Sequence, residues 1–158
     1  MRFQTTGIAL LLVAAGSAAA QEAARDDIPA ALRGGFAEVG DWVTRAAALV
    51  PADQYGYRPV ETVRTFGQLV GHLADSYNYY CARGAGREVE WADPVEKGSQ
   101  DKAVLVAKLK EATEACTAAY AGANGRPQPL LANVGHTSLH YGNMVTYLRM
   151  LGLVPPSS

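Results

Sequence analysis

Apolar residues recur at helical spacing in four stretches of this chain, separated by segments that contain glycine and proline. The first stretch starts at Ile28 and ends before Pro51, with apolar side chains three, four or seven residues apart. These apolar positions are Leu32, Phe36, Val39, Val43 and Val50. Thr65 opens the second stretch, with Gln68 three residues later as in a capping box, and this stretch continues to about Arg83. The pattern predicts two amphipathic helices joined by a loop.

The other two stretches follow the connection GAGREVEWADPVEKG. Ser99 is a suitable N-cap for a third helix. The apolar stripe of this helix is Leu105, Leu109, Ala112, Cys116 and Ala119. A fourth helix is expected from near Leu131 to Gly152, with Pro155 and Pro156 beyond its end. Four helices with short or moderate connections predict an all-α fold, an up-and-down four-helix bundle.

The N-terminal segment has the features of a secretory signal peptide. Arg2 precedes an apolar run that ends at Ala15, and the small residues up to Ala20 give an A-x-A cleavage pattern. This divides the chain into a leader, 1–20, and one domain over 21–158. The apolar run is shorter than the roughly 20 residues that span a membrane. We therefore expect a periplasmic or secreted protein without membrane contact after the leader is removed.

Charge gives no indication of a polyanionic partner. The 158 residues carry a formal net charge of −1, without a basic or acidic block. This distribution argues against nucleic-acid binding and against an anionic membrane surface. The expected partner is a small-molecule substrate of unknown identity, and the choice between a monomer and a homodimer stays open.

All three histidines of the chain fall on the inward faces of expected helices. At about 100° per residue, the fourth helix places His136 and His140 in one sector with Asn143 and Tyr147. On the second helix, His72 also lies on the apolar face. We therefore expect three buried imidazoles on two helices.

Buried imidazoles need partners, because an unpaired polar group in a core costs about 1–3 kcal/mol. A shared metal is one such partner, since neutral imidazole is a common ligand of zinc, nickel and iron, and residues i and i+4 can converge on one ion. This predicts a divalent transition-metal site formed by His72, His136 and His140. The alternative is a metal-free bundle in which each histidine is hydrogen-bonded in the core. Thr137 follows His136, so the pair is not an H-E-x-x-H motif.

Three protein ligands leave at least one metal position open, which is typical of catalytic rather than structural sites. Polar side chains within two turns of the histidines are candidates to support them. They are Asp75, Ser76, Tyr79, Asn143 and Tyr147. Asp75 is the one carboxylate placed to act as a base. The simpler interpretation is a solvated Asp75 at the helix edge, with the tyrosines in the core.

The two cysteines of the chain, Cys81 and Cys116, lie near the end of the second helix and within the third. An exported chain meets an oxidising compartment, and consecutive helices are expected to pack side by side in antiparallel orientation. We therefore predict a disulfide between them. Two separate thiols are the alternative.

Two segments of the sequence resemble DinB-like proteins. The segment VPADQYGYRPVETVRTFGQLVGHLADSYNYYC resembles their second-helix region, where a loop with proline and tyrosine leads into a helix with one inward histidine. The segment HTSLHYGNMVTYLRMLGLVPP resembles their final helix, in which an H-x-x-x-H pair precedes a leucine-arginine segment, a glycine and prolines. The resemblance covers most of the expected domain, with order and spacing preserved.

This resemblance implies a four-helix bundle that holds a divalent metal, with His72, His136 and His140 as its ligands. The wider superfamily includes thiol-dependent transferases and isomerases. The resemblance therefore implies a metal-dependent hydrolase or a thiol-dependent transferase acting on a small substrate. Export departs from the cytosolic setting of the thiol transferases. A non-catalytic metal- or ligand-binding bundle is the alternative.

Overall fold

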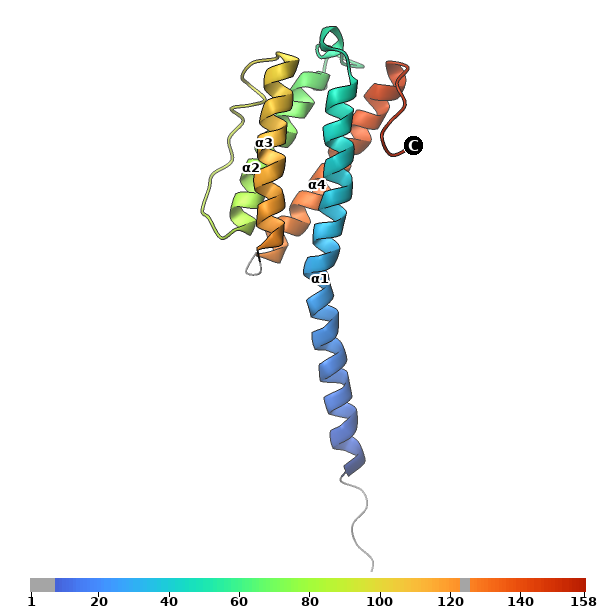
Figure 1. Cartoon of the computed structure of the whole chain (residues 1–158), viewed down its shortest axis with the longest axis vertical. Helices are drawn as coiled ribbons and strands as arrows, with labels where there is room; N and C mark the ends of the chain where they lie inside the picture. The colour runs from blue at the N-terminus through green and yellow to red at the C-terminus, as the bar shows by residue number, and fades with distance from the viewer. Residues whose placement is uncertain (1–7, 123–125) are drawn as a thin grey trace, which may run out of the picture. The chain divides into compact units, whose positions relative to one another are not determined.

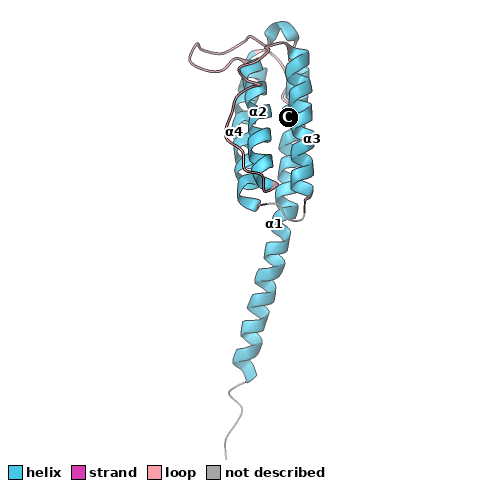
Figure 2. Cartoon of the chain, turned by 90° about the vertical axis from the view of Figure 1, so that its left-hand side faces the viewer, coloured by secondary structure: helices cyan, strands magenta, loops and turns pink. Residues whose placement is uncertain are grey.

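The computed structural model describes residues 8–122 and 126–158, with side chains from residue 29 onward. Within these ranges the secondary structure is helical and contains no strand (Figures 1 and 2). The elements are α1 (Ile8–Leu49), the 3₁₀ turn η1 (Ala52–Gln54), α2 (Phe66–Gly84), α3 (Lys102–Ala121) and α4 (Pro127–Met150). The predicted all-α, four-helix fold is confirmed.

Internal contacts divide the chain into two units, Met1–Ala31 and Leu32–Ser158. The second unit holds the helix bundle and all the side chains discussed below. Residues 1–7 of the leader predicted at 1–20 lie outside the described residues, and its cleavage stays a prediction. None of the helices in the described residues is long and apolar enough to cross a membrane.

The start of α2 matches the sequence pattern in detail. The Thr65 hydroxyl accepts the backbone N–H of Gln68 at 3.1 Å, and the Gln68 side chain accepts the N–H of Thr65 at 2.9 Å. This is the predicted capping box. The predicted N-cap of α3 is wrong by two residues: Asp101 caps this helix by accepting N–H groups of its first turn. Ser99 instead accepts the N–H of Asp101.

Two helices begin earlier than predicted. The first begins at Ile8 instead of Ile28, because the alanine-rich sequence before Ile28 has high helix propensity. The last begins at Pro127 instead of Leu131, since proline is well tolerated in the first turn, where its missing N–H has no helical partner.

The C-terminal end of α4 confirms the predicted helix termination at a glycine. Gly152 has φ of +74° just beyond the helix, a conformation that glycine adopts without steric cost. The N–H of Leu153 donates to the carbonyl of Leu148 at 2.8 Å and so satisfies one of the last helical acceptors.

The helix order differs from strict up-and-down alternation, because α2 and α3 run in the same direction (Figure 1). The starts of the two helices are adjacent, since a Cβ atom added to Gly67 of α2 would lie 3.3 Å from the side chain of Leu105 of α3. At their other ends, the disulfide joins Cys81 to Cys116 with Cα atoms 5.1 Å apart. The connection 85–101 therefore runs back along the bundle, and we call it the crossover segment.

The predicted disulfide is confirmed, although the antiparallel packing from which it was argued is wrong. Helix α4 runs antiparallel to α2, since the end of α2 at Gly84 packs against Leu130 near the start of α4.

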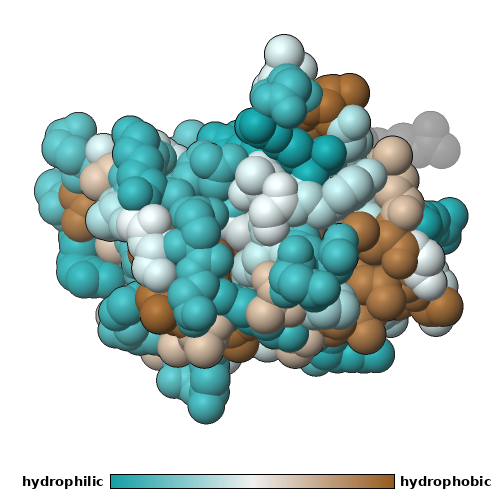
Figure 3. Space-filling model, turned by 90° about the horizontal axis from the view of Figure 1, so that it is seen from above, coloured by the Kyte–Doolittle hydropathy of each residue, from teal (hydrophilic) through white to brown (hydrophobic). Residues whose placement is uncertain are grey.

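The core of the bundle is filled by aliphatic and aromatic side chains from all four helices. Phe36 of α1 stacks on Tyr120 of α3 with ring centroids 4.6 Å apart and meets Tyr77 of α2 edge-on at 5.3 Å. Such aromatic pairs add to the stabilisation from buried apolar area. Seen from above, the surface is mostly hydrophilic, and hydrophobic side chains gather mainly on one side (Figure 3).

Candidate metal centre

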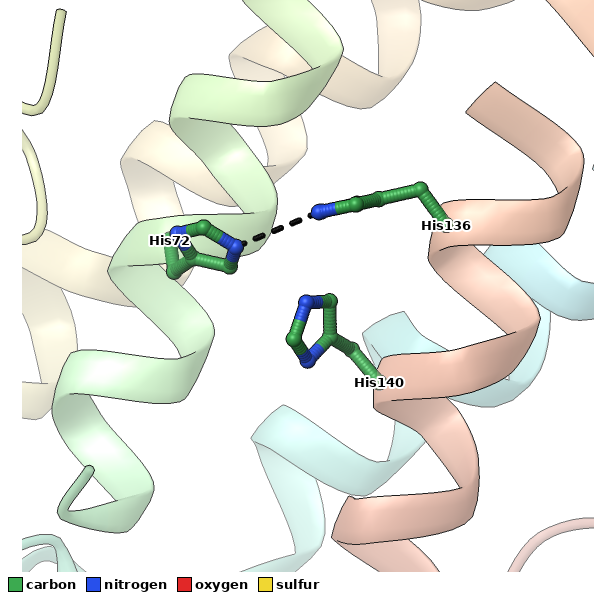
Figure 4. Close-up of side chains that lie close together, drawn as sticks. All are labelled: His72, His136 and His140. Atoms are coloured by element: carbon green, nitrogen blue, oxygen red, sulfur yellow. Dashed lines mark hydrogen bonds between the residues drawn. The ribbon is translucent and has the colours of Figure 1, made fainter. Parts of the chain in front are cut away.

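The three histidines meet between α2 and α4 (Figure 4). His72 comes from the second turn of α2, and His136 and His140 lie one turn apart on α4, so that all three rings point toward one another. One ring nitrogen of each lies within 4.8 Å of the others, and the two Nε2 atoms of His72 and His136 are 3.3 Å apart. The predicted convergence of these residues is therefore present. His72 is buried, as expected, while His136 and His140 are partly buried.

The spacing of one nitrogen pair, between His72 and His136, fits two ligands of a transition metal. Two ligands of a tetrahedral ion with metal–nitrogen distances of about 2.0–2.1 Å are separated by about 3.3–3.4 Å, which matches the two Nε2 atoms. The Nδ1 atom of His136 is buried without a hydrogen-bond partner among the described residues. Within the described residues, hydrogen bonding therefore accounts for Nε2 of His136, through its contact with His72, and leaves Nδ1 without a partner.

Electrostatics keep the three imidazoles neutral, which is the form that binds metals. Burial, followed by the neighbouring His72 and Arg64, lowers the pKa of His136 to about 4. Burial and the same neighbours, together with His136, lower the pKa of His140 to about 4. The pKa of His72 is lowered by burial and by Arg64, and Glu96 opposes this shift. At neutral pH the rings can therefore offer lone pairs.

Glu96, from the crossover segment, is the residue near the centre that sequence reasoning missed. Its Oε2 atom lies 2.9 Å from Nδ1 of His72, and its Oε1 atom accepts a hydrogen bond from Nε of Arg64 at 2.7 Å. Arg64 and Glu96 form no sequence motif together, because they are 32 positions apart. The available signal was Gly71, because glycine inside a helix is less favourable than alanine and is needed where another backbone comes too close for a Cβ.

Asp75 has a different role from the predicted base. It is 2% exposed, and its two oxygens accept the N–H groups of Val95 and Glu96 at 2.9–3.2 Å. Burial raises the pKa of Asp75, although these hydrogen bonds oppose the shift. The solvated alternative is also wrong, because the crossover segment covers this face of α2. Asp75 anchors that segment.

The other polar candidates surround the centre in different ways. The amide nitrogen of Asn143 lies 3.3 Å from Nδ1 of His140, and an amide side chain can present either its nitrogen or its oxygen to that atom. The Tyr147 hydroxyl donates to the carbonyl of Arg64 at 2.7 Å. Ser76 donates to the carbonyl of His72 within α2, and Tyr79 packs edge-on against Trp91. Of these four side chains, Asn143 is the one that lies against a histidine ring.

A pocket of about 550 Å³ opens beside His140. Its walls combine polar groups with a few apolar side chains. They are formed by Pro59, Thr62, Val63, Arg64, Gln68, Leu69, Glu96, His140, Asn143 and Tyr147. This volume lies in the range of small-molecule sites. A ligand in the pocket would therefore contact one histidine of the centre directly.

Comparison with known proteins gives one match. The model of the DinB superfamily matches residues 35–154, which include all three histidines and all four helices in part or in full. No curated protein and no solved structure matches the chain.

Proposed function

The chain belongs to the DinB superfamily, and from this premise we propose that it binds a divalent transition metal through His72, His136 and His140. The metal is zinc, nickel or iron. We further propose that the protein is exported and acts as a metal-dependent hydrolase on a small substrate held in the adjacent pocket.

The observation that carries this proposal is the convergence of three imidazoles, with one ring nitrogen of each within 4.8 Å of the others and one pair 3.3 Å apart. Three protein nitrogens leave coordination positions open, as in catalytic rather than structural zinc sites. A divalent metal in such a site supplies Lewis acidity and lowers the pKa of a bound water. The disulfide Cys81–Cys116 is compatible with export to an oxidising compartment.

The chain's own residues would bind and orient the substrate. Arg64, Gln68 and Asn143 line the pocket with hydrogen-bond donors, and Leu69 adds an apolar contact. We favour hydrolysis over thiol transfer because the predicted export would take the protein away from the low-molecular-weight thiols of the cytoplasm.

A specific observation favours a second candidate, a non-catalytic metal- or ligand-binding bundle. In the described part of the chain, each carboxylate close to His72 has both oxygens engaged. Asp75 holds backbone N–H groups, Asp93 contacts Trp91 and Lys97, and Glu96 contacts His72 and Arg64. A hydrolase of this kind would therefore lack a free carboxylate as general base.

Titration calorimetry with Zn²⁺, Ni²⁺ and Fe²⁺, followed by a hydrolysis screen, tests the proposal. We expect one metal per chain, and metal-dependent turnover of a small ester, amide or lactone that the triple histidine-to-alanine variant lacks. Metal binding without turnover of any ester, amide or lactone in the screen would favour the non-catalytic candidate. A wild-type protein that binds none of these metals would refute both metal-based candidates.

A further inference from the structure

Glu96 bridges a histidine of the centre and an arginine. Its side chain is 15% exposed, and its two oxygens have different partners. Oε2 faces Nδ1 of His72 at 2.9 Å, whereas Oε1 accepts from Nε of Arg64 at 2.7 Å. A second guanidinium contact, from Nη2 to Oε2, measures 3.4 Å. The contact of Oε2 with His72 and the two contacts from the guanidinium of Arg64 fix the carboxylate in one orientation.

The backbone of Glu96 is held against α2 by two further features. Gly71 precedes His72, and a Cβ there would lie 2.8 Å from Cα and 2.9 Å from the nitrogen of Glu96. Only glycine allows this approach, although glycine inside a helix costs about 0.5–1 kcal/mol relative to alanine. One turn further on, the buried carboxylate of Asp75 accepts the N–H of Glu96 at 2.9 Å.

These features have one common result, the position of the Glu96 carboxylate at His72. An ionised carboxylate can only accept hydrogen bonds, so a neutral His72 must carry its proton on Nδ1. The lone pair then lies on Nε2, the atom that faces His136. Histidine in water favours the opposite tautomer, with the proton on Nε2, which would point a hydrogen at the metal position.

We propose that Glu96 is the positioning residue of the centre: it fixes His72 in the Nδ1–H tautomer and aims Nε2 at the metal, while Arg64 holds the carboxylate in place. The ligand role of His72 rests on the proposed function, but its tautomer does not. Carboxylates that orient metal-binding histidines typically change metal affinity 10- to 100-fold when they are removed.

The tautomer is measurable without metal, by long-range ¹H–¹⁵N correlation spectra of ¹⁵N-labelled, chelator-treated protein at neutral pH. We expect His72 to be protonated on Nδ1 in the wild type and to lose this preference in Glu96→Ala. Glu96→Gln should retain it, because the amide oxygen still accepts the Nδ1 proton. Glu90→Ala is the matched control, since Glu90 is an exposed glutamate of the same crossover segment. A wild-type His72 protonated on Nε2, or an unchanged tautomer in Glu96→Ala, overturns the inference.

Co²⁺ titration then measures the effect on the centre through the visible d–d spectrum and the dissociation constant. Glu96→Ala should weaken binding 10- to 100-fold and alter the spectrum, Glu96→Gln should lie between Glu96→Ala and wild type, and Glu90→Ala should match wild type. Equal affinity and an identical spectrum in Glu96→Ala would contradict the positioning role. A wild-type protein without any Co²⁺ binding would refute the proposed function, while the tautomer result would still decide the role of Glu96.

A second variant covers the case in which Glu96→Ala does not fold. Gly71→Ala leaves Glu96 in the chain but forces its backbone away from α2, so it should reproduce the tautomer change and the weaker Co²⁺ binding. The control is Gly142→Ala on α4, where an added Cβ meets nothing within 4 Å. A Gly71→Ala protein with wild-type tautomer and affinity would argue against the role assigned to Glu96.

Discussion

Removal of the Asp75 carboxylate should release the crossover segment and lower the free energy of unfolding. In Asp75→Ala the N–H groups of Val95 and Glu96 lose the acceptor that they now share. Each unsatisfied group of this kind costs about 1–3 kcal/mol when buried. Both residues are only partly buried, so water can replace part of the loss, and we expect a total of about 2–3 kcal/mol. Asp75→Asn retains an acceptor and should lose about half as much.

Urea denaturation of metal-free protein with its disulfide intact measures this effect. With a slope of about 1–3 kcal/mol per molar urea, the midpoint of Asp75→Ala should fall by about 0.7–3 M. Trypsin should also cut faster within the crossover segment, at Arg87 or Lys97. Asp53→Ala is the control, because Asp53 is exposed on η1. If Asp75→Ala unfolded at the same urea concentration as Asp53→Ala and resisted trypsin like wild type, the anchoring role would be wrong.

Three more predictions concern the disulfide, the histidines and the leader. Replacement of Cys81 and Cys116 by serine should cost about 3–4 kcal/mol in urea denaturation, the chain-entropy value for a sequence separation of 35, and equal stability would contradict it. The pKa values of His136 and His140 are about 4 in the folded protein and near 6.5 when unfolded. Their contribution to stability is therefore complete above about pH 6.5 and is lost as the pH falls toward 4. The urea midpoint of chelated wild type should drop across this window more than that of a variant with both histidines replaced by glutamine. Mass spectrometry of protein recovered from its host should find Gln21 as the first residue, and an intact Met1 would refute cleavage.

The sequence was sufficient for the parts of the fold that local chemistry determines. The capping box of Thr65, the C-terminal glycine of α4 and the inward histidines each depend on residues within one or two helical turns. The i, i+4 spacing of His136 and His140 requires a common face, and the apolar face of α2 brings His72 toward them. These features could be predicted because helix geometry alone relates the residues involved.

The missed features of the helix order and of the candidate site all depend on the crossover segment. A helical wheel places Gly71 on the outer face of α2 and Asp75 at the edge of its inner face, because it contains no information about a distant segment that covers them. The parallel direction of α2 and α3, the burial of Asp75 and the contact of Glu96 with His72 all follow from this one connection. A buried glycine on the outer face of a helix and a buried carboxylate at its edge are the residues with which α2 meets this covering segment.

The most direct test of the metal centre is an anomalous-difference map from crystals of the zinc-loaded protein, with data collected on both sides of the zinc absorption edge. We expect one peak per chain, about 2.0–2.1 Å from a ring nitrogen of each of His72, His136 and His140. The peak should disappear in the His72→Ala variant. A wild-type map without a peak between α2 and α4, or with its main peak at other residues, would contradict the proposed metal centre.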